Sequence, residues 1–277
     1  DNKDGWQLIS SPFTNALISD FTNGVEGAYD LYKYEGSKVG EEWNNQYNDD
    51  NFEINFISGR GYLASYEKEK IAEIKGVLNK ESILDLNNIT YNVESEYYNC
   101  HLLGNPFTFD MDWSKLSEYT YNIANGYAVV GEDGSYEYKA DGIIKVGDGF
   151  FIKTVGKNAS LYYNHNMSSK NRSQVTFINI IASGKAGKDN VIVNFAGKAE
   201  GFNKLQNFND AIATVYVSEN GKHYGIANVD ENTTEVALNF NAKEMGNYSI
   251  SLDVNGKFEA VTLVDRFTGV ETNMLLE

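Results

Sequence analysis

The sequence predicts an all-β protein whose N-terminal part is an internally duplicated antiparallel β unit, either a sandwich or a barrel. The two prolines, Pro12 and Pro106, lie 94 residues apart within similar phrases, LISSPFT and LLGNPFT. A glycine-flanked phrase follows each of them, first GRGYLA at 59–64 and then GDGFFI at 147–152. Because two motifs recur in the same order, we predict a duplicated unit of roughly ninety residues. The two copies span about residues 5–79 and 99–163.

The composition agrees with a sheet protein and excludes several functions. The 277 residues include 19 Tyr, 15 Phe and 25 Gly, and aromatic residues favour strands while glycines favour turns. The net charge of −16 argues against nucleic-acid binding, which needs basic patches. The single cysteine, Cys100, cannot form an intrachain disulfide, and no apolar run is long enough for a transmembrane segment. The chain begins at Asp1 rather than Met, so we expect a mature or trimmed product.

The first copy supplies short strands with alternating side chains. Alternation and turn residues predict strands at 6–10, 29–34, 52–56 and 62–66, and another that begins with Glu41-Glu42-Trp43. Pro12 marks the end of the first strand because proline has no N–H group to donate. The segment 67–78 contains good helix formers, but its β-branched residues around Gly76 favour strand in this context.

The second copy repeats this plan and ends in a polar linker. We expect strands at 100–103, 127–130, 135–138, 150–153 and 160–163. The turn sequence GEDG at 131–134 predicts a hairpin between the second and third of these. Residues 164–173 are almost wholly polar, which indicates a linker. The excess of Asp and Glu over Lys and Arg also lies mainly before this linker. We therefore predict one domain at 1–168 and another at 169–277.

The C-terminal part shows cleaner alternation. Apolar rows occur at 191–195, 236–240 and 248–254, and Asn255-Gly256 predicts a two-residue hairpin turn towards Phe258. Residues 202–211 fit either one short helix or an irregular crossover. Strands every eight to twelve residues are typical of antiparallel sandwiches, so we predict an immunoglobulin- or fibronectin-like β-sandwich here.

Five phrases in order resemble a module of secreted and surface proteins of Bacteroidetes, of an adhesin type with tandem β-rich regions. They are GWQLISSP at 5–12, YDLY at 29–32, GRGYLA at 59–64, LGNPF at 103–107 and GDGFF at 147–151. Residues 190–273 resemble the all-β module that commonly follows, most clearly in VTLVDRFTG at 261–269. The resemblance implies a non-catalytic adhesion or interaction role, an extracellular or outer-membrane location, and an extracellular protein or glycan as partner.

The resemblance also bears on the end of the chain and on catalysis. Another strand normally follows in such proteins, so we expect a fragment or a processed tail. The last strand, around 271–276, is then predicted to lie near an open edge that pairs with another chain. The family carries no agreed catalytic residues, so none is transferred and we expect no enzyme activity.

The candidate chemical groups are few, and most have a plain structural explanation. His101, His165 and His223 lack metal-binding spacing, and Cys100 is expected to be a small buried thiol. Asp110 and Asp112 lie two residues apart and would face one ion if extended, which is the only hint of a structural calcium and of any cofactor. The favoured alternative is that Asp112 caps a short helical turn beginning at Trp113.

Aromatic side chains provide the remaining candidate site, because a flat ring stacks on a sugar. Trp43, beside two glutamates, is the best candidate for exposure, followed by Tyr136 and Tyr138. Trp6 and Trp113 flank the repeated motif and are expected in the core. A second hypothesis is therefore a carbohydrate-binding accessory region of a larger secreted enzyme, and a third is a stalk that positions another domain.

Overall fold

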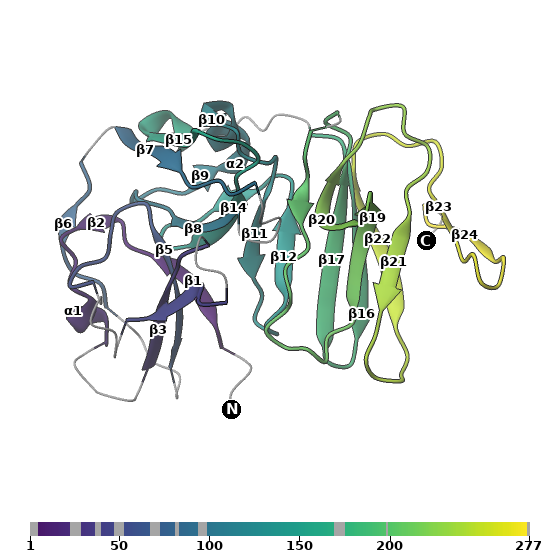
Figure 1. The fold of residues 1–277 in the computed structure, drawn as a ribbon, viewed down its shortest axis with the longest axis horizontal. Helices are drawn as coiled ribbons and strands as arrows, with labels where there is room; N and C mark the ends of the chain where they lie inside the picture. The colour runs from purple at the N-terminus through teal and green to yellow at the C-terminus, as the bar shows by residue number, and fades with distance from the viewer. Residues whose placement is uncertain are drawn as a thin grey trace.

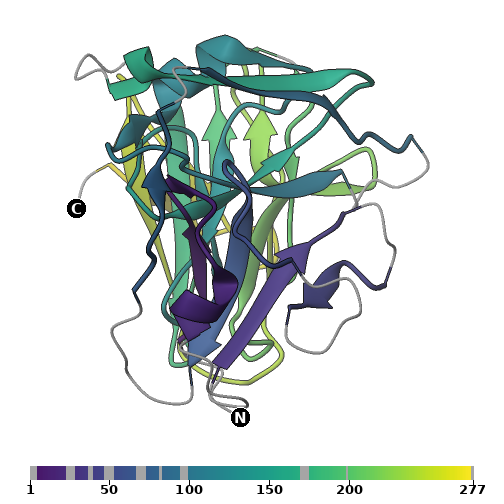
Figure 2. The same ribbon diagram turned by 90° about the vertical axis from the view of Figure 1, so that its left-hand side faces the viewer.

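The protein is all-β, as the sequence predicts. The computed structural model describes residues 5–22, 29–36, 40–46, 53–66, 73–80, 83–93, 99–168, 175–197 and 199–275. Within these ranges the helical segments are the short α1 (Ile18–Thr22) and α2 (Trp113–Leu116) and the single turns Ser117–Tyr119 and His165–Ser168. Figure 1 shows the N-terminal sheets on the left and the green and yellow C-terminal sheet on the right. Figure 2 views the molecule from the N-terminal side, with the purple and blue strands in front.

Two four-stranded antiparallel sheets form the N-terminal part. The first has the order β1-β5-β3-β4 and consists of β1 (Gln7–Ser10), β3 (Tyr29–Tyr34), β4 (Trp43–Asn45) and β5 (Gly61–Tyr66). The second has the order β8-β14-β11-β12 and consists of β8 (Cys100–Gly104), β11 (Tyr127–Val130), β12 (Tyr136–Lys139) and β14 (Gly149–Lys153). The strand order is therefore the same in both sheets.

The register is also the same in both sheets. Ser10 lies opposite Gly61 in the first sheet, and Gly104 lies opposite Gly149 in the second. Leu8 lies opposite Leu63, and Leu102 lies opposite Phe151. Each proline thus follows its strand by two residues in an equivalent place. The predicted hairpin at 131–134 is confirmed, because Val130 pairs with Tyr136 across it.

The two sheets are joined by reciprocal backbone contacts. The Ser10 amide donates to the Gly147 carbonyl (2.7 Å), and the Gly104 amide donates to the Gly59 carbonyl (3.0 Å). Gly59 and Gly147 have φ of +79° and +85°, which glycine adopts without steric cost. A Cβ atom on Gly61 would lie 2.3 Å from the Leu103 carbonyl oxygen, so the crossing requires glycine at this point.

Short strands complete the N-terminal part. They form the pair β2 (Phe13–Thr14) with β6 (Val77–Leu78), the pair β9 (Met111–Asp112) with β13 (Ile143–Ile144), and a sheet of β7 (Ile83–Ile89), β15 (Ala159–Asn164) and β10 (Thr120–Tyr121). The strand expected at 52–56 does not form over the described residues 53–56, where Asn55 makes only an isolated bridge with Leu17. Half of the segment 67–78, residues 67–72, lies outside the described residues, and in the described half β6 is the strand that forms.

One curled sheet forms the C-terminal part, in the order β21-β19-β20-β17-β16-β22, with β18 paired to β20. Its strands are β16 (Phe177–Gly184), β17 (Gly187–Asn194), β18 (Phe202–Asn203), β19 (Thr214–Glu219), β20 (Lys222–Asn228), β21 (Leu238–Asn241) and β22 (Ser249–Asn255). The edge strands β21 and β22 are joined by only the residues 242–248, and the rings of Phe240 and Tyr248 meet there (5.3 Å). The concave face holds a core of its own, including Ile180, Val191 and Val215.

The hairpin expected at Asn255-Gly256 does not form. Gly256 ends β22 with φ of +125°, but the chain then crosses the open end of the sheet, where the Phe258 ring packs on Phe195 (5.4 Å). The following strands, β23 (Thr262–Val264) and β24 (Glu271–Asn273), pair only with each other and project from the sheet at the right of Figure 1. The final strand predicted around 271–276 is therefore β24. Residue 276, the last of the predicted range, lies outside the described residues.

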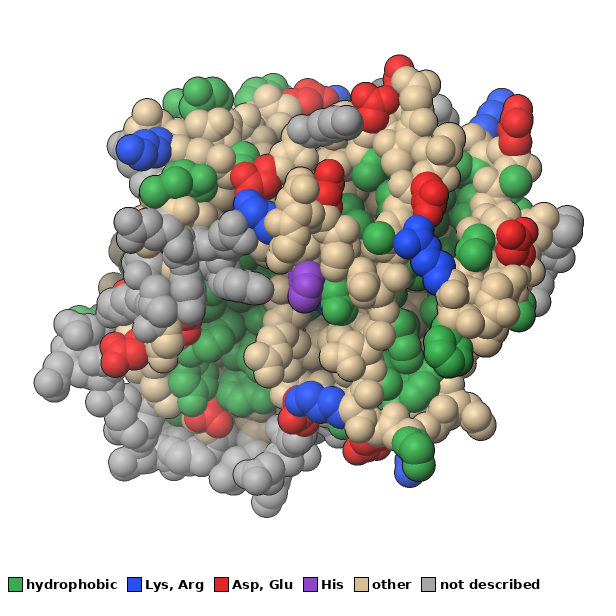
Figure 3. All heavy atoms as spheres, turned by 45° about the vertical axis from the view of Figure 1, so that its right-hand side comes forward, with side chains coloured by type: hydrophobic (Ala, Val, Ile, Leu, Met, Phe, Trp, Pro, Cys, Tyr) green, Lys and Arg blue, Asp and Glu red, His purple; other side chains and the backbone are tan. Residues whose placement is uncertain are grey.

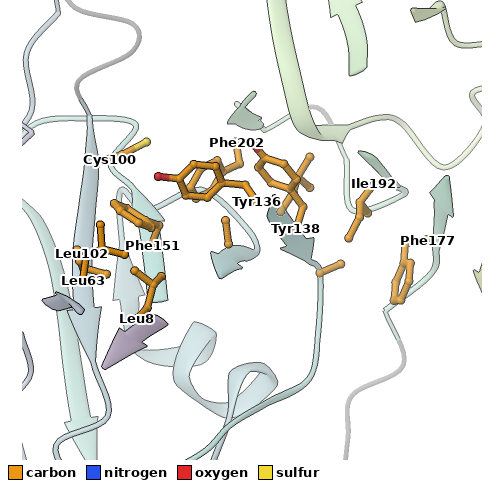
Figure 4. Packing of buried hydrophobic residues seen from close by; sticks show 13 residues of the cluster. Leu8, Leu63, Cys100, Leu102, Tyr136, Tyr138, Phe151, Phe177, Ile192 and Phe202 are labelled. Atoms are coloured by element: carbon orange, nitrogen blue, oxygen red, sulfur yellow. The ribbon is translucent and has the colours of Figure 1, made fainter. Parts of the chain in front are cut away.

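A shared hydrophobic cluster joins the N- and C-terminal parts. Leu8 and Leu63 come from the first sheet, Tyr138 and Phe151 from the second, and Ile226 from the C-terminal sheet. Figure 4 shows Leu8, Leu63, Phe151 and Tyr138 within this cluster, with Phe202 and Ile192 of the C-terminal sheet beside Tyr138. The C-terminal sheet thus packs through β17 against β12. The predicted linker at 164–173 begins with the last residue of β15 and continues in the turn at His165–Ser168, and residues 169–173 lie outside the described residues.

The close crossing of the two N-terminal sheets predicts a graded response to added methyl groups. We expect Gly61→Ala to lower the free energy of unfolding by about 2–4 kcal/mol, because its Cβ would overlap backbone. Gly149→Ala should cost less, since its nearest neighbour is 3.0 Å away. Gly246→Ala, with its nearest neighbour at 3.8 Å, is the control. Urea unfolding measures all three, and equal stabilities would contradict the proposed crossing.

Candidate functional site

Trp43 lies at a junction of three sheets. Its ring contacts the Tyr34 ring (4.8 Å) from the first sheet, the Phe151 ring (6.0 Å) from the second, and the Phe208 ring (6.0 Å) from the C-terminal part. Phe208 also stacks on Tyr136 (5.4 Å). Trp43 is half-buried, so much of its surface already packs against protein. It remains a weak candidate for sugar stacking.

Tyr136 and Tyr138 do not provide a sugar-stacking surface, so that part of the prediction is wrong. Both are buried, and Tyr138 has no exposed surface. Figure 4 shows them inside the cluster, between the second sheet and the C-terminal strands. The Tyr138 hydroxyl accepts a hydrogen bond from the Leu205 amide (2.6 Å). The predicted hairpin of β11 and β12 that carries these tyrosines is present, but the C-terminal sheet covers it.

Amide side chains from the C-terminal part cover the free edge of β12. The Asn190 side chain accepts from the Tyr138 amide (2.9 Å) and donates to the Tyr138 carbonyl (3.0 Å). The Asn207 side chain accepts from the Tyr136 amide (2.9 Å). These two amides take the place of a neighbouring strand. Asparagine in a strand or loop carries no sequence signal for this role, and sequence reasoning missed both residues.

A buried ion pair lies beside these amides. The Lys204 ammonium contacts the Asp189 carboxylate (2.7 Å), donates to the Asn190 carbonyl (2.8 Å) and lies 4.7 Å from the centre of the Tyr138 ring. Burial lowers the pKa of Lys204 to about 8 and raises the pKa of Asp189, while their mutual attraction opposes both shifts. The pair joins β17 to the crossover after β18 and has the geometry of a structural contact.

The two aspartates proposed for calcium are held by different donors. Asp112 is buried and caps α2, with its Oδ1 accepting from the Ser114 amide (2.9 Å). Asp110 is exposed and accepts from the Val146 amide (3.0 Å). The capping interpretation is therefore confirmed. Within the described ranges, no group of three or more His, Cys, Asp or Glu side chains is placed to hold a metal ion.

Cys100 and His101 do not form a thiol–imidazole pair. Cys100 is buried in the core, and this burial raises the pKa of its thiol to about 12, so the proton-bound form prevails. The His101 Nε2–H group donates to the Thr90 carbonyl (2.8 Å), and burial lowers the pKa of His101 to about 4. His223 is exposed against Tyr216 (4.3 Å between rings), and the side chain of His165 lies outside the described residues.

The C-terminal stretch 231–275 presents an unusually open surface. None of its residues is buried, although it includes four strands. Figure 3 shows groups of hydrophobic side chains among polar ones on the side that includes these strands. Phe267 is 97% exposed at the tip of the β23–β24 hairpin. The resemblance singles out the phrase VTLVDRFTG at 261–269, but the sequence does not show that Phe267 within it is exposed.

The turn that carries Phe267 is well ordered by local hydrogen bonds. The Asp265 carboxylate accepts from the Phe267 amide (2.8 Å) and from the Thr268 hydroxyl (2.7 Å), and these hydrogen bonds lower the pKa of Asp265. The Gly269 amide donates to the Asp265 carbonyl (2.7 Å). Arg266 forms an ion pair with Glu235, which ties the turn to the loop before β21. The exposed ring is thus fixed on a defined backbone.

A small pocket lies between the crossover after β18 and the edge strand β21. Its volume is about 190 Å³, and its lining is rich in amide side chains: Gln206, Asn207, Asn209, Asp210, Ile212, Thr214, Asn241 and Lys243. Lys243 forms an ion pair with Asp210 at its rim (3.1 Å). The polar side chains of this lining can bond the hydroxyl groups of a small ligand, and the rest of the pocket surface offers apolar contact.

Comparison with known proteins gives no assignment. No family model, no curated protein and no solved structure matches this chain. Among the described residues, no helix is long and apolar enough to cross a membrane.

The buried ion pair predicts a strong response to removal of one partner. We expect Lys204→Met to lower the free energy of unfolding by about 3–5 kcal/mol, because Asp189 would be left buried without a counter-charge. The double variant Lys204→Met/Asp189→Leu should recover much of this loss. Chemical denaturation compares them, and a Lys204→Met variant as stable as the wild type would contradict the assignment.

The environment of His101 predicts a loss of stability in mild acid. Its pKa is about 4 in the folded chain and 6.5 for the free side chain, so the unfolded state binds more protons between these values. The stabilisation is complete above pH 6.5 and is lost as the pH falls towards 4, by about 1–3 kcal/mol. His101→Gln should weaken this pH dependence. An NMR titration that finds an ordinary pKa for His101 would contradict the prediction.

Proposed function

We propose that this chain is a non-catalytic interaction module of a secreted or surface protein of a Bacteroidetes bacterium, acting in cell adhesion at the extracellular or outer-membrane surface. The resemblance of the five N-terminal phrases supports this assignment. The observation that carries it is the ordered presentation of Phe267 on the β23–β24 hairpin. The proposed partner is an extracellular protein with an apolar pocket that accepts an aromatic ring.

The physical argument rests on preorganisation. An exposed aromatic ring loses apolar hydration when it enters a pocket, and aromatic residues dominate the binding energy of many interfaces. If the ring were on a flexible loop, the entropy lost when the loop becomes ordered would offset this gain in binding free energy. The Asp265 cap and the ion pair of Arg266 with Glu235 fix the turn beforehand. Little ordering is then needed when Phe267 binds.

Adhesion assays test this proposal. We expect the chain to bind surfaces coated with fibronectin, laminin or collagen, and Phe267→Ala to weaken that binding at least about 30-fold, the effect of losing an aromatic hot spot. Asp265→Ala should weaken it less, by loosening the turn. Met245→Ala is the matched control, because Met245 is equally exposed but lies in the β21–β22 loop. Binding that does not respond to Phe267→Ala would contradict the proposal.

A carbohydrate-binding accessory role in a larger secreted enzyme is the second candidate. The amide-lined pocket between the crossover and β21 favours it, because amide and carboxylate groups are good partners for sugar hydroxyls. A glycan array distinguishes the two candidates. Glycan binding that vanishes in Gln206→Ala would favour the pocket, and loss in Trp43→Ala would favour the half-buried ring. If the chain binds no glycan on the array but does bind a matrix protein, the result would favour adhesion.

We also propose that the N-terminal part arose by internal duplication and that the chain has two domains. The equal strand order and register of the two N-terminal sheets support an internal duplication, with Ser10 equivalent to Gly104 and Gly61 to Gly149. The separate sheets on either side of residue 169 support domains at 1–168 and 169–277. The curled C-terminal sheet, with its concave core, supports a relationship to immunoglobulin- or fibronectin-like sandwiches.

A further inference from the structure

The strand β22 is an edge strand with a free side. It pairs with β16 in unbroken register from Ser249 to Asn255, and in the described part of the chain no strand pairs with its other side. Its apolar side chains Ile250, Leu252 and Val254 lie on the concave face of the sheet, and Val254 is 36% exposed. The strand contains no proline, no lysine and no bulge, which are the usual protections of an edge.

The direction of its unpaired backbone groups follows from the pairing on β16. The Phe195 amide donates to the Thr176 carbonyl, and hydrogen-bonded pairs alternate along antiparallel strands. The residues Ile178, Ile180 and Ala182 therefore bond to β17, and the residues between them bond to β22. The outward N–H and C=O groups of β22 consequently belong to the residues with apolar side chains, Ile250, Leu252 and Val254.

The molecule covers a comparable edge elsewhere. On β12, the side chains of Asn190 and Asn207 bond the free backbone groups of Tyr138 and Tyr136. Among the described residues, no such side chain bonds the outward groups of Ile250, Leu252 or Val254. Half-exposed apolar side chains and unpaired backbone groups therefore coincide on β22.

We propose that β22 pairs antiparallel with β22 of a second copy of this chain, about a two-fold axis at Leu252. In this register Leu252 lies opposite Leu252 of the second copy, and Ile250 lies opposite Val254. All outward backbone groups of these three residues are then satisfied. The apolar side chains of both copies form one row on the concave side of a continuous sheet.

Self-complementarity favours a second copy as the occupant of this edge. Asp253 is the only charged residue of β22, and the proposed register places it opposite Ser251 rather than opposite another carboxylate. The remaining cost is the repulsion between two chains of net charge −16, which salt screens. Dimerisation should therefore strengthen as ionic strength rises. The predicted edge strand β24 also has an unpaired side among the described residues, but it is only three residues long, whereas β22 offers seven.

This inference goes beyond the proposed adhesion role and does not depend on it. Phe267 lies on the separate β23–β24 hairpin, so a dimer through β22 presents two such tips and raises avidity for a partner surface. Loss of the dimer should reduce avidity on a dense surface but leave the one-to-one affinity of each tip unchanged. Failure of one proposal is thus distinguishable from failure of the other.

Analytical ultracentrifugation of the full chain over a concentration series provides the first test. We expect the wild type to pass from its mass of 31.0 kDa to twice that mass. Ile250→Pro removes one outward N–H group without removing a bond to β16, so it should abolish the dimer. Ile250→Val is the matched control and should keep it. A wild type that stays monomeric at all concentrations and salt strengths would overturn the proposal.

A mixed-disulfide experiment tests the register and does not depend on whether Ile250→Pro folds. Ser251 and Asp253 are both exposed and would lie directly opposite each other across the axis, about 4.5 Å apart between Cα atoms. An equal mixture of Ser251→Cys and Asp253→Cys chains should therefore form a disulfide-linked pair on oxidation. Either variant alone should not, because like positions are offset beyond the reach of a disulfide. Cys100 is buried and should not contribute. A dimer that gives no mixed disulfide would overturn the proposed register.

Discussion

The fold depends on one close backbone crossing between the two N-terminal sheets. Ser10 bonds to Gly147, Gly104 bonds to Gly59, and no side chain fits where Gly61 meets the Leu103 carbonyl. This contact fixes the two sheets relative to each other and so sets the direction of β12, the last strand of the second sheet. The C-terminal sheet then packs on β12, and the shared core follows from that position.

The two edge strands β12 and β22 differ in whether other groups cover their free backbone. The edge at β12 is closed by the side-chain amides of Asn190 and Asn207, and the Lys204 ammonium lies against the Tyr138 ring, so the C-terminal part packs on the N-terminal part there. The edge at β22 and the hairpin of β23 and β24 have no such cover among the described residues. Buried polar contacts thus lie at the internal junction, whereas the stretch 231–275 at the far end has no buried residue and carries the exposed Phe267 ring.

Local patterns predicted much of the fold, because they report local constraints. The repeated proline and glycine phrases correctly located β1, β5, β8 and β14, and the GEDG turn correctly located the hairpin of β11 and β12. Alternation alone could not show which face another sheet would cover, so Tyr136 and Tyr138 were expected at the surface although they are buried. Asn190, Asn207 and Lys204 carry no local signal, because their partners lie far away in sequence. The cap at Asp112 was predictable because its partner, Ser114, is two residues away.

Hydrogen–deuterium exchange at single-amide resolution tests the central claim, that the glycine crossing holds the fold together while the C-terminal end stays open. The account predicts that the amides of Ser10 and Gly104 exchange only through global unfolding, because both are bonded at the crossing. It also predicts that the outward amide of Leu252 exchanges quickly in dilute solution and slows as concentration rises. Rapid exchange at Ser10 and Gly104, at rates like those of 231–275, would contradict it.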